Sequence, residues 1–401
     1  MIESWRWFGP LDAITLSEIA QTGATGIVTA LHDIPYGELW SREAIAARQA
    51  VIAQAPGNLH WNVVESLPVH EDIKRGGEGL DGLFANYRQS LANLAAQGVG
   101  TVCYNFMPML DWTRTRLDAA LPTGGHALRF SQVEMAGFEI HMLHRAGAEA
   151  EYSNAVVAAA DDWADKADAT ERARLLNAIM SGLPGAYDRY DVDSLRAALI
   201  PWKGMTADDL RSNFARFLAE VIPTAQDLGM RMCVHPDDPP RPLLGLPRIV
   251  SDAGDIAQIM AMQDSRANGL TLCSGSLGAN PVNDVSAIAR LFAERIHFAH
   301  LRNVTREPDG SFQEAAHLEG DTDMPALIAV LLREEARRQT EGRGDHAIPF
   351  RPDHGHALLD DPGRDTHPGY PLTGRLRGLA ELRGVIAGLR HGAGDGGALR
   401  A

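Results

Sequence analysis

The chain has 401 residues, of which 45% are hydrophobic, and its 37 basic and 52 acidic residues give a formal charge of −15. This negative charge repels phosphate backbones and argues against a nucleic-acid partner. The start of the chain lacks a basic stretch followed by an apolar one, and no segment holds eighteen uninterrupted apolar residues, so we expect neither secretion nor a membrane span.

Apolar, β-branched runs closed by polar or turn residues predict eight strands. In chain order they span about 26–31, 60–65, 100–106, 229–235, 269–274, 296–302, 312–318 and 346–353. Helix-like stretches with apolar residues three and four apart lie between most of them, at 41–55, 81–97, 208–227, 252–266, 284–294 and 324–341. Eight strands alternating with helices predict an α/β fold in which the whole chain forms one (β/α)₈ TIM barrel domain.

One interval, from about 112 to 207, is too long for a single crossover helix. It is rich in Ala, Glu, Asp and Arg with helical periodicity, so we expect a helical insertion after the third strand. Such an insertion could cover the barrel mouth or form a subunit contact, and it favours a homodimer or a higher homo-oligomer. The Gly-rich end of the chain, about 391–401, is expected to be flexible.

Four side chains that can bind a transition metal stand where predicted strands end, namely His235, Cys273, His300 and Asp353. Because strand C-termini build the active site of such a barrel, we expect these residues to converge from the fourth, fifth, sixth and eighth strands. Two imidazoles, a thiolate and a carboxylate suit a divalent first-row ion. Taken singly, a strand-end histidine is more often structural and a cysteine more often a small buried hydrophobe, but the coincidence of four favours a metal.

The remaining cysteines and one further histidine are assigned to packing. Cys103 and Cys233 are expected in the barrel wall, and His297 lies on the opposite strand face from His300. An odd number of cysteines, far apart, suits a reduced compartment better than a disulfide framework, so we expect a cytoplasmic protein.

Further polar residues near predicted strand ends indicate a small polar substrate. We assign substrate binding to His32, Glu65, Asn105, Asp237, Arg302 and Arg351. Either arginine could hold a substrate carboxylate as a bidentate pair, and a salt bridge to a neighbouring acid is the alternative for each. Asp237 stands with Asp238 in a proline-rich turn that we expect to leave both carboxylates beside the ligand, and a solvated acidic turn is the alternative.

Two residues near the last predicted strand are candidates for proton transfer. His354 directly follows Asp353 on a Gly-containing turn, and a histidine titrates near neutral pH. Tyr370 lies shortly after that turn and could be a second acid/base, a substrate clamp or a surface aromatic.

These residues belong to a set of motifs that spans nearly the whole chain. The motifs include TrpArgTrpPheGlyPro (5–10), ThrAlaLeuHis (29–32), ValCysTyrAsnPheMetPro (102–108), AspTrpThrArgThr (111–115), HisProAspAspProProArgPro (235–242), CysSerGlySer (273–276), HisLeuArgAsn (300–303) and ArgProAspHisGlyHis (351–356). In this combination the chain resembles the mannonate dehydratases of hexuronate breakdown, members of the xylose-isomerase-like barrel group.

The resemblance implies dehydration of D-mannonate to 2-keto-3-deoxy-D-gluconate with Mn²⁺ or Fe²⁺. By similarity the metal ligands are His235, Cys273, His300 and Asp353, and the acid/base residues are His354 and Tyr370. Which of these two is the acid and which the base stays open at this point.

Two other functions remain to be weighed. An aldose–ketose isomerase or epimerase on the same barrel also uses a divalent metal, but such sites favour oxygen ligands, whereas Cys273 makes this one softer. A non-catalytic sugar-acid binding protein would hold a structural metal in a closed four-ligand site.

Overall fold

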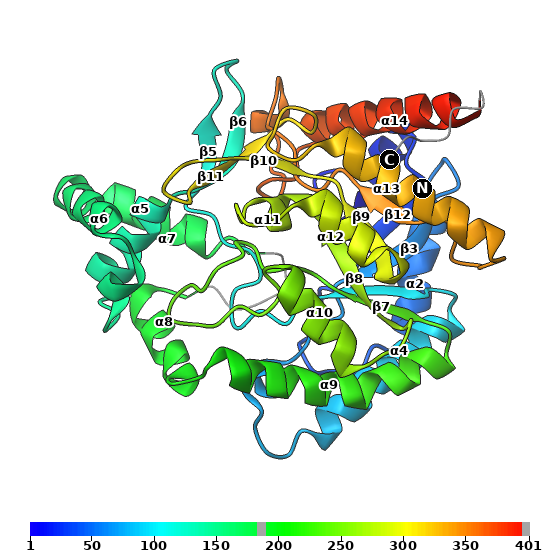
Figure 1. The fold of residues 1–401 in the computed structure, drawn as a ribbon, viewed down its shortest axis with the longest axis horizontal. Coiled ribbons are helices and arrows are strands. Elements are labelled where there is room, and N and C mark those ends of the chain that lie inside the picture. Colours follow the sequence, from blue (N-terminus) through cyan, green and yellow to red (C-terminus); the bar gives the residue numbers. More distant parts are fainter. Residues whose placement is uncertain (183–189, 395–401) are drawn as a thin grey trace.

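The computed structural model describes residues 1–182 and 190–394, and within them eight parallel strands close into a barrel (Figure 1). Around the barrel the strands follow the order β1-β12-β9-β8-β7-β4-β3-β2. Their bounds are β1 Ile2–Arg6, β2 Gly26–Thr29, β3 His60–Glu65, β4 Thr101–Tyr104, β7 Arg231–Val234, β8 Asn268–Cys273, β9 Ile296–His300 and β12 Pro349–Arg351. The predicted (β/α)₈ barrel is confirmed.

Helices cover the outside of the barrel, since each crossover between parallel strands must return across it. The covering helices are α1 Leu16–Gln21, α2 Arg42–Ala53, α3 Glu71–Arg75, α4 Asp81–Ala96, α9 Ala207–Asp227, α10 Ala253–Met262, α11 Ser274–Gly278, α12 Val285–Leu291, α13 Met324–Thr340 and α14 Leu372–Gly394. Their apolar faces pack on the outward side chains of the strands as one large core. No helix among the described residues is long and apolar enough to cross a membrane.

The inside of the barrel is filled by a small separate cluster of side chains. It consists of Val28, Val63, Cys103, Cys233 and Phe298, all at most 2% exposed. Cys103 and Cys233 are register partners on the adjacent strands β4 and β7, so the prediction that they belong to the wall is confirmed. This filled layer is the floor beneath the strand ends.

Two parts of the predicted strand order are wrong. The segment 312–318 is not a barrel strand: its residues Phe312–Ala315 form β11, in a four-stranded antiparallel sheet outside the barrel. Its alternating burial is typical of any half-exposed antiparallel strand, and this pattern does not say which sheet the strand joins. The strand that the prediction lacks is β1, whose short sequence Ile-Glu-Ser-Trp-Arg has little apolar alternation.

The insertion therefore follows the fourth barrel strand, not the third, and it is not wholly helical. It opens with the hairpin β5 Arg116–Ala120 and β6 His126–Phe130, and β6 pairs with β11 in the order β10-β11-β6-β5, where β10 is Asn303–Arg306. Helices α5 Gln132–Gly137, α6 Asn154–Lys166, α7 Ala169–Ile179 and α8 Val192–Leu199 follow and project to one side of the barrel (Figure 1). Residues 391–394 of the tail predicted to be flexible belong to α14, and the rest of it lies outside the described residues.

His297 is buried among the helices on the outer face of β9, as predicted. Its Nε2–H donates to the Arg266 carbonyl at 2.7 Å, and burial lowers the pKa of this imidazole to about 3. His297 of the unfolded chain therefore binds a proton near pH 6.5, whereas the same residue in the folded protein stays neutral down to about pH 3. The contribution of His297 to the free energy of unfolding is complete above pH 6.5 and is lost as the pH falls towards 3.

We predict that His297→Gln removes this part of the acid sensitivity. Between pH 6 and 4 the free energy of unfolding of the unsubstituted protein should fall faster than that of the variant, by about 1.4 kcal/mol per pH unit. Urea unfolding at several pH values measures the two slopes. Parallel slopes would show that His297 is not held neutral.

Candidate metal centre and active site

The four predicted metal-binding side chains come from neighbouring barrel strands. His235 follows β7, Cys273 ends β8, His300 ends β9 and Asp353 comes two residues after β12. In chain order β7, β8, β9 and β12 are the fifth to eighth strands of the barrel, and they are also neighbours in it. The prediction that another barrel strand separates the strands of His300 and Asp353 is therefore wrong. Cys273 is paired in register with His300, and His300 with Arg351.

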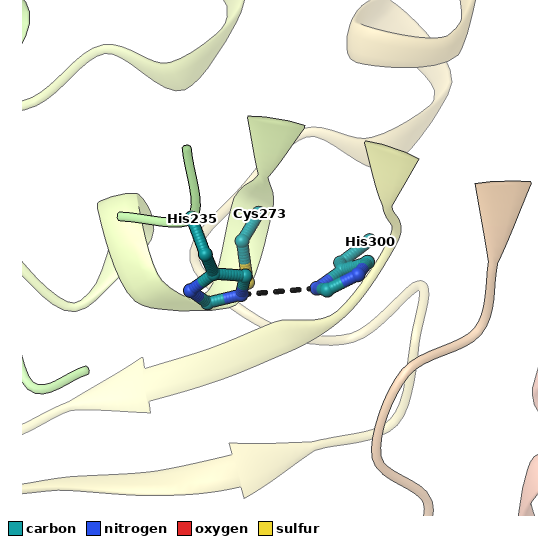
Figure 2. Close-up of side chains that lie close together, drawn as sticks. All are labelled: His235, Cys273 and His300. Carbon is teal, nitrogen blue, oxygen red and sulfur yellow. Dashed lines mark hydrogen bonds between the residues drawn. The ribbon is translucent and has the colours of Figure 1, made fainter. Parts of the chain in front are cut away.

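Three of these residues direct their donor atoms at one point (Figure 2). His235 Nε2 lies 3.0 Å from His300 Nδ1, and the donor atoms of His235, Cys273 and His300 all lie within 4.8 Å of one another. The 3.0 Å contact is a hydrogen bond between the two imidazoles, and two nitrogens bound tetrahedrally to one ion at about 2.1 Å lie only slightly farther apart, at about 3.4 Å. The spacing and the nitrogen–sulfur donor set therefore fit a divalent transition ion.

Neighbouring groups orient these donors. His235 Nδ1–H donates to the Pro236 carbonyl at 2.6 Å, which leaves the lone pair on Nε2, facing His300. Cys273 Sγ accepts hydrogen bonds from the backbone N–H (3.4 Å) and the hydroxyl (3.1 Å) of Ser276, which fix the position of the sulfur. Gly275, which lies between Cys273 and Ser276, must be a glycine, because a Cβ there would lie 2.0 Å from Arg302 Nε.

Glu65 lies behind His300. Its Oε2 is 3.5 Å from His300 Nε2, a buried nitrogen that makes no hydrogen bond. A carboxylate in this place orients a ligating histidine, so Glu65 is positioned to support the metal centre. A second possible ligand group consists of Glu65, Cys103 and His300. Because both Glu65 oxygens already accept from Arg351, at 2.7 and 3.0 Å, the group of His235, Cys273 and His300 is favoured.

Asp353 borders the three donors. Its Oδ2 lies 3.8 Å from Cys273 Sγ and 3.9 Å from His300 Nδ1, and 3.2 Å from Arg302 Nη1, while Arg351 binds Oδ1. Burial alone would raise the pKa of this carboxyl, but the two arginines hold it well below its usual range. Asp353 also has φ +59°, a strained backbone conformation of the kind that collects at functional sites.

Both candidate carboxylate-binding arginines are already paired with acids of the protein. Arg351 binds Glu65 and Asp353, and Arg302 Nη2 donates to Asp238 Oδ2 at 2.9 Å. The salt-bridge alternative therefore describes both arginines in this structure. Arg114 extends the network, since it donates to Asp238 at 2.7 Å and to Glu314 at 2.8 Å, and all these groups are buried.

His354 lies at the end of this network. Its Nδ1 is 2.9 Å from Glu314 Oε1 and 3.1 Å from Arg302 Nη1. Burial would raise the pKa of Glu314, but Arg302 and His354 outweigh it and hold that pKa at about 2. Glu314 is thus ionised and can accept from Nδ1–H of His354, whereas the Arg302 N–H, which can only donate, faces the same nitrogen. The Tyr370 ring packs edge-on against His354 with centroids 5.0 Å apart, and burial raises the pKa of its phenol.

A pocket of about 420 Å³ opens over these groups. Eight of the predicted site residues line it: Glu65, Asn105, His235, Arg302, Arg351, Asp353, His354 and Tyr370. Cys273 and His300 are fully buried beside it.

Two predicted substrate-binding residues do not line this pocket. Asp237 is buried and accepts from Val250 N (2.7 Å) and the Ser251 hydroxyl (2.8 Å), so its role is to hold the following loop. His32 lines a separate hollow beside Phe8 and accepts from Arg6 at 3.2 Å.

Three residues of the site are absent from the prediction, Asp111, Arg114 and Glu314, and a fourth, Asp238, was expected beside the ligand but was not assigned to substrate binding. Asp238 neighbours Asp237 in the proline-rich turn, and the two cannot be told apart without the conformation of that turn. Arg114 and Asp111 lie in the motif 111–115, which has no recognisable ligand spacing. Glu314 was not predicted as a site residue because its strand, 312–318, was expected to belong to the barrel wall.

A parallel barrel whose strand ends gather a candidate metal-donor group beside a pocket lined by His354 and Tyr370 defines a barrel enzyme. A family model described as D-mannonate dehydratase (UxuA) matches residues 1–394. The mannonate dehydratase of Chromohalobacter salexigens is 53% identical over 392 residues, with 98% of this chain and 99% of that protein covered. Mannonate dehydratase 1 of Agrobacterium fabrum is 50% identical, with 98% of each covered.

A solved structure agrees with these sequence relatives. The crystal structure of mannonate dehydratase from Streptococcus suis serotype 2 superposes with a TM-score of 0.76 at 33% identity, covering 98% of this chain and 95% of that one. The chain belongs to the D-mannonate dehydratase family.

We predict that Cys273→Ala weakens divalent metal binding by at least about 100-fold, because it removes a donor and not only a group that orients one. Cys233→Ala, which removes a buried thiol of the barrel interior, is the matched control. Elemental analysis of both variants, purified without chelator, measures the bound metal. Equal metal content in the two variants would exclude Cys273 as a ligand.

Proposed function

We propose that this chain is a metal-dependent hydro-lyase that converts D-mannonate to 2-keto-3-deoxy-D-gluconate and water in hexuronate breakdown. The observation that carries the proposal is that a group of nitrogen and sulfur donors, His235, Cys273 and His300, lies beside a pocket that His235, His354 and Tyr370 line. Family membership supplies the substrate.

The proposed ligands are His235, Cys273, His300 and Asp353, and the proposed cofactor is Mn²⁺ or Fe²⁺. Imidazole and thiolate donors accept both ions, and the supply of each ion in the cell decides between them. When bound, the ion supplies positive charge at the substrate carboxylate, which makes the hydrogen on C2 more acidic.

The protein's own residues then divide the proton transfers. We assign the proton of neutral His354 to Nδ1, which faces the Glu314 carboxylate, so that Nε2 carries the lone pair and His354 is the base that takes the C2 proton. Burial keeps the Tyr370 phenol protonated, which suits it to donate a proton to the departing C3 hydroxyl. The C2–H bond and the C3–O bond break, water leaves, and the resulting enol becomes the 2-keto product.

The buried arginines act within the protein. Arg302 donates to Asp238 and faces Asp353, and Arg351 holds Glu65, so their charges position the ligands and His354. Neither has a free bidentate edge for a substrate carboxylate in this structure. A homodimer or higher homo-oligomer and a cytoplasmic location stay predictions.

We predict that His354→Asn lowers kcat by about 10²- to 10⁴-fold, the usual contribution of a general base. Bound metal should be retained, because the donor group of His235, Cys273 and His300 is unchanged. Turnover of D-mannonate to a 2-keto-3-deoxy acid and elemental analysis are measured on one preparation. Unchanged turnover would remove His354 from the mechanism, and an isomer as sole product of the unsubstituted enzyme would refute dehydration.

Glu314→Gln tests the orientation of His354 separately. The amide keeps the shape of Glu314 but loses the charge that holds Nδ1–H, so we expect kcat to fall by about 100-fold with KM changed much less. Glu314→Asp should recover part of the loss. Steady-state kinetics on the three proteins measures this, and equal kcat values would show that Glu314 only packs.

A further inference from the structure

Asp111 is a pocket carboxylate to which the mechanism gives no role. It lies in the segment that leaves β4 and is 7% exposed. It lines the 420 Å³ pocket of the metal donors and also an adjoining pocket of about 280 Å³. The two pockets share the wall residues Ser66, Asn105, Met107 and Asp111. Asp111 therefore belongs to the wall that the two pockets have in common.

The bonding of Asp111 differs from that of the other carboxylates in the pocket wall. Glu65, Asp238 and Asp353 are each paired with an arginine. Asp111 Oδ1 accepts only the backbone N–H of Trp112, at 2.8 Å, and its Oδ2 is buried without a hydrogen-bond partner among the described residues. Burial outweighs that one hydrogen bond and raises the pKa of the carboxyl to about 6.

The nearest cation does not satisfy this oxygen. Lys74 lines the adjoining pocket, but its ammonium donates to Glu71 at 2.5 Å and to the Met107 carbonyl at 2.8 Å. Asn105 belongs to the same shared wall, and its side-chain amide makes no hydrogen bond within the described part of the chain. An acceptor and an amide thus lie together, unpaired, on the same wall.

A buried carboxylate oxygen without a partner costs folding free energy, and such groups collect where a ligand supplies the missing hydrogen bond. The reacting carbons of a sugar acid belong beside His235 and His354. The rest of its chain, from C4 to C6, carries hydroxyls that need polar partners beyond that end, and the wall shared by the two pockets offers the Asp111 carboxylate and the Asn105 amide.

We propose that Asp111 binds one hydroxyl among C4, C5 and C6 of the substrate, with Asn105 beside it, and so selects a long polyhydroxy acid. This inference rests on the proposed function. A site built to hydrogen-bond a substrate hydroxyl strongly rejects the analogue that lacks it.

The test compares D-mannonate with its 4-deoxy, 5-deoxy and 6-deoxy analogues on the metal-loaded enzyme. The unsubstituted enzyme should lose about 10- to 100-fold in kcat/KM with one analogue. Asp111→Ala should lose about as much with D-mannonate itself and nothing further with that analogue. The matched control is Asp255→Asn, a buried aspartate that binds Arg211 and Ser251 N outside the pocket, and it should keep the original discrimination.

The variant Asp111→Asn separates the loss of a substrate contact from an effect of the substitution on folding. Removing an unpaired buried charge should leave the metal content unchanged and the thermal midpoint at pH 8 unchanged or raised, whereas a structural carboxylate would lower the midpoint. Discrimination that survives in both Asp111 variants, or an unsubstituted enzyme indifferent to all three analogues, overturns the proposal. If the unsubstituted enzyme fails to dehydrate D-mannonate, the proposed function fails, and calorimetric affinities for the same four compounds still decide the role of Asp111.

Discussion

The active site depends on the pairing of charges that the barrel mouth buries. Arg302 contacts Asp238, Asp353 and His354 at 2.9, 3.2 and 3.1 Å, and Arg114 joins Asp238 to Glu314. Loss of one partner from such a group leaves an uncompensated buried charge, which costs about 3–5 kcal/mol. Each member therefore fixes the position of the next, and the metal donors and the imidazole are held in place before any substrate arrives.

This constraint decides what each charged residue can do. An arginine at a barrel mouth suggests a site for a substrate carboxylate, yet here both Arg302 and Arg351 are occupied by the protein's own acids. Their effect on the reaction passes through Glu65, Asp353 and His354. Asp111 is the exception among the acids of the pocket wall, because no cation in the described part of the chain forms a salt bridge with it. A buried carboxylate without a paired cation lowers the stability of the fold, and such a loss of stability is typical of a binding site.

The parallel strands explain why so many site residues were predictable. Their C-terminal ends lie on one face of the barrel, so a polar residue that ends an apolar run is brought there whatever its distance along the chain. Glu65 and Arg351 are 286 residues apart and still form an ion pair. The prediction survived an error in strand numbering, because the missed β1 and the misplaced 312–318 leave the position of each strand end unchanged.

By itself, the sequence determined the barrel class, the residues at the strand ends and the family, because apolar periodicity, strand-end position and motifs are local properties. Only the tertiary structure decided which acid neutralises which arginine, that Glu314 reaches His354 from a strand outside the barrel, and that Asp237 faces away where Asp238 faces in. These outcomes depend on turn conformation and on sheet membership. Both are settled by packing between segments far apart in the chain, which no local pattern records.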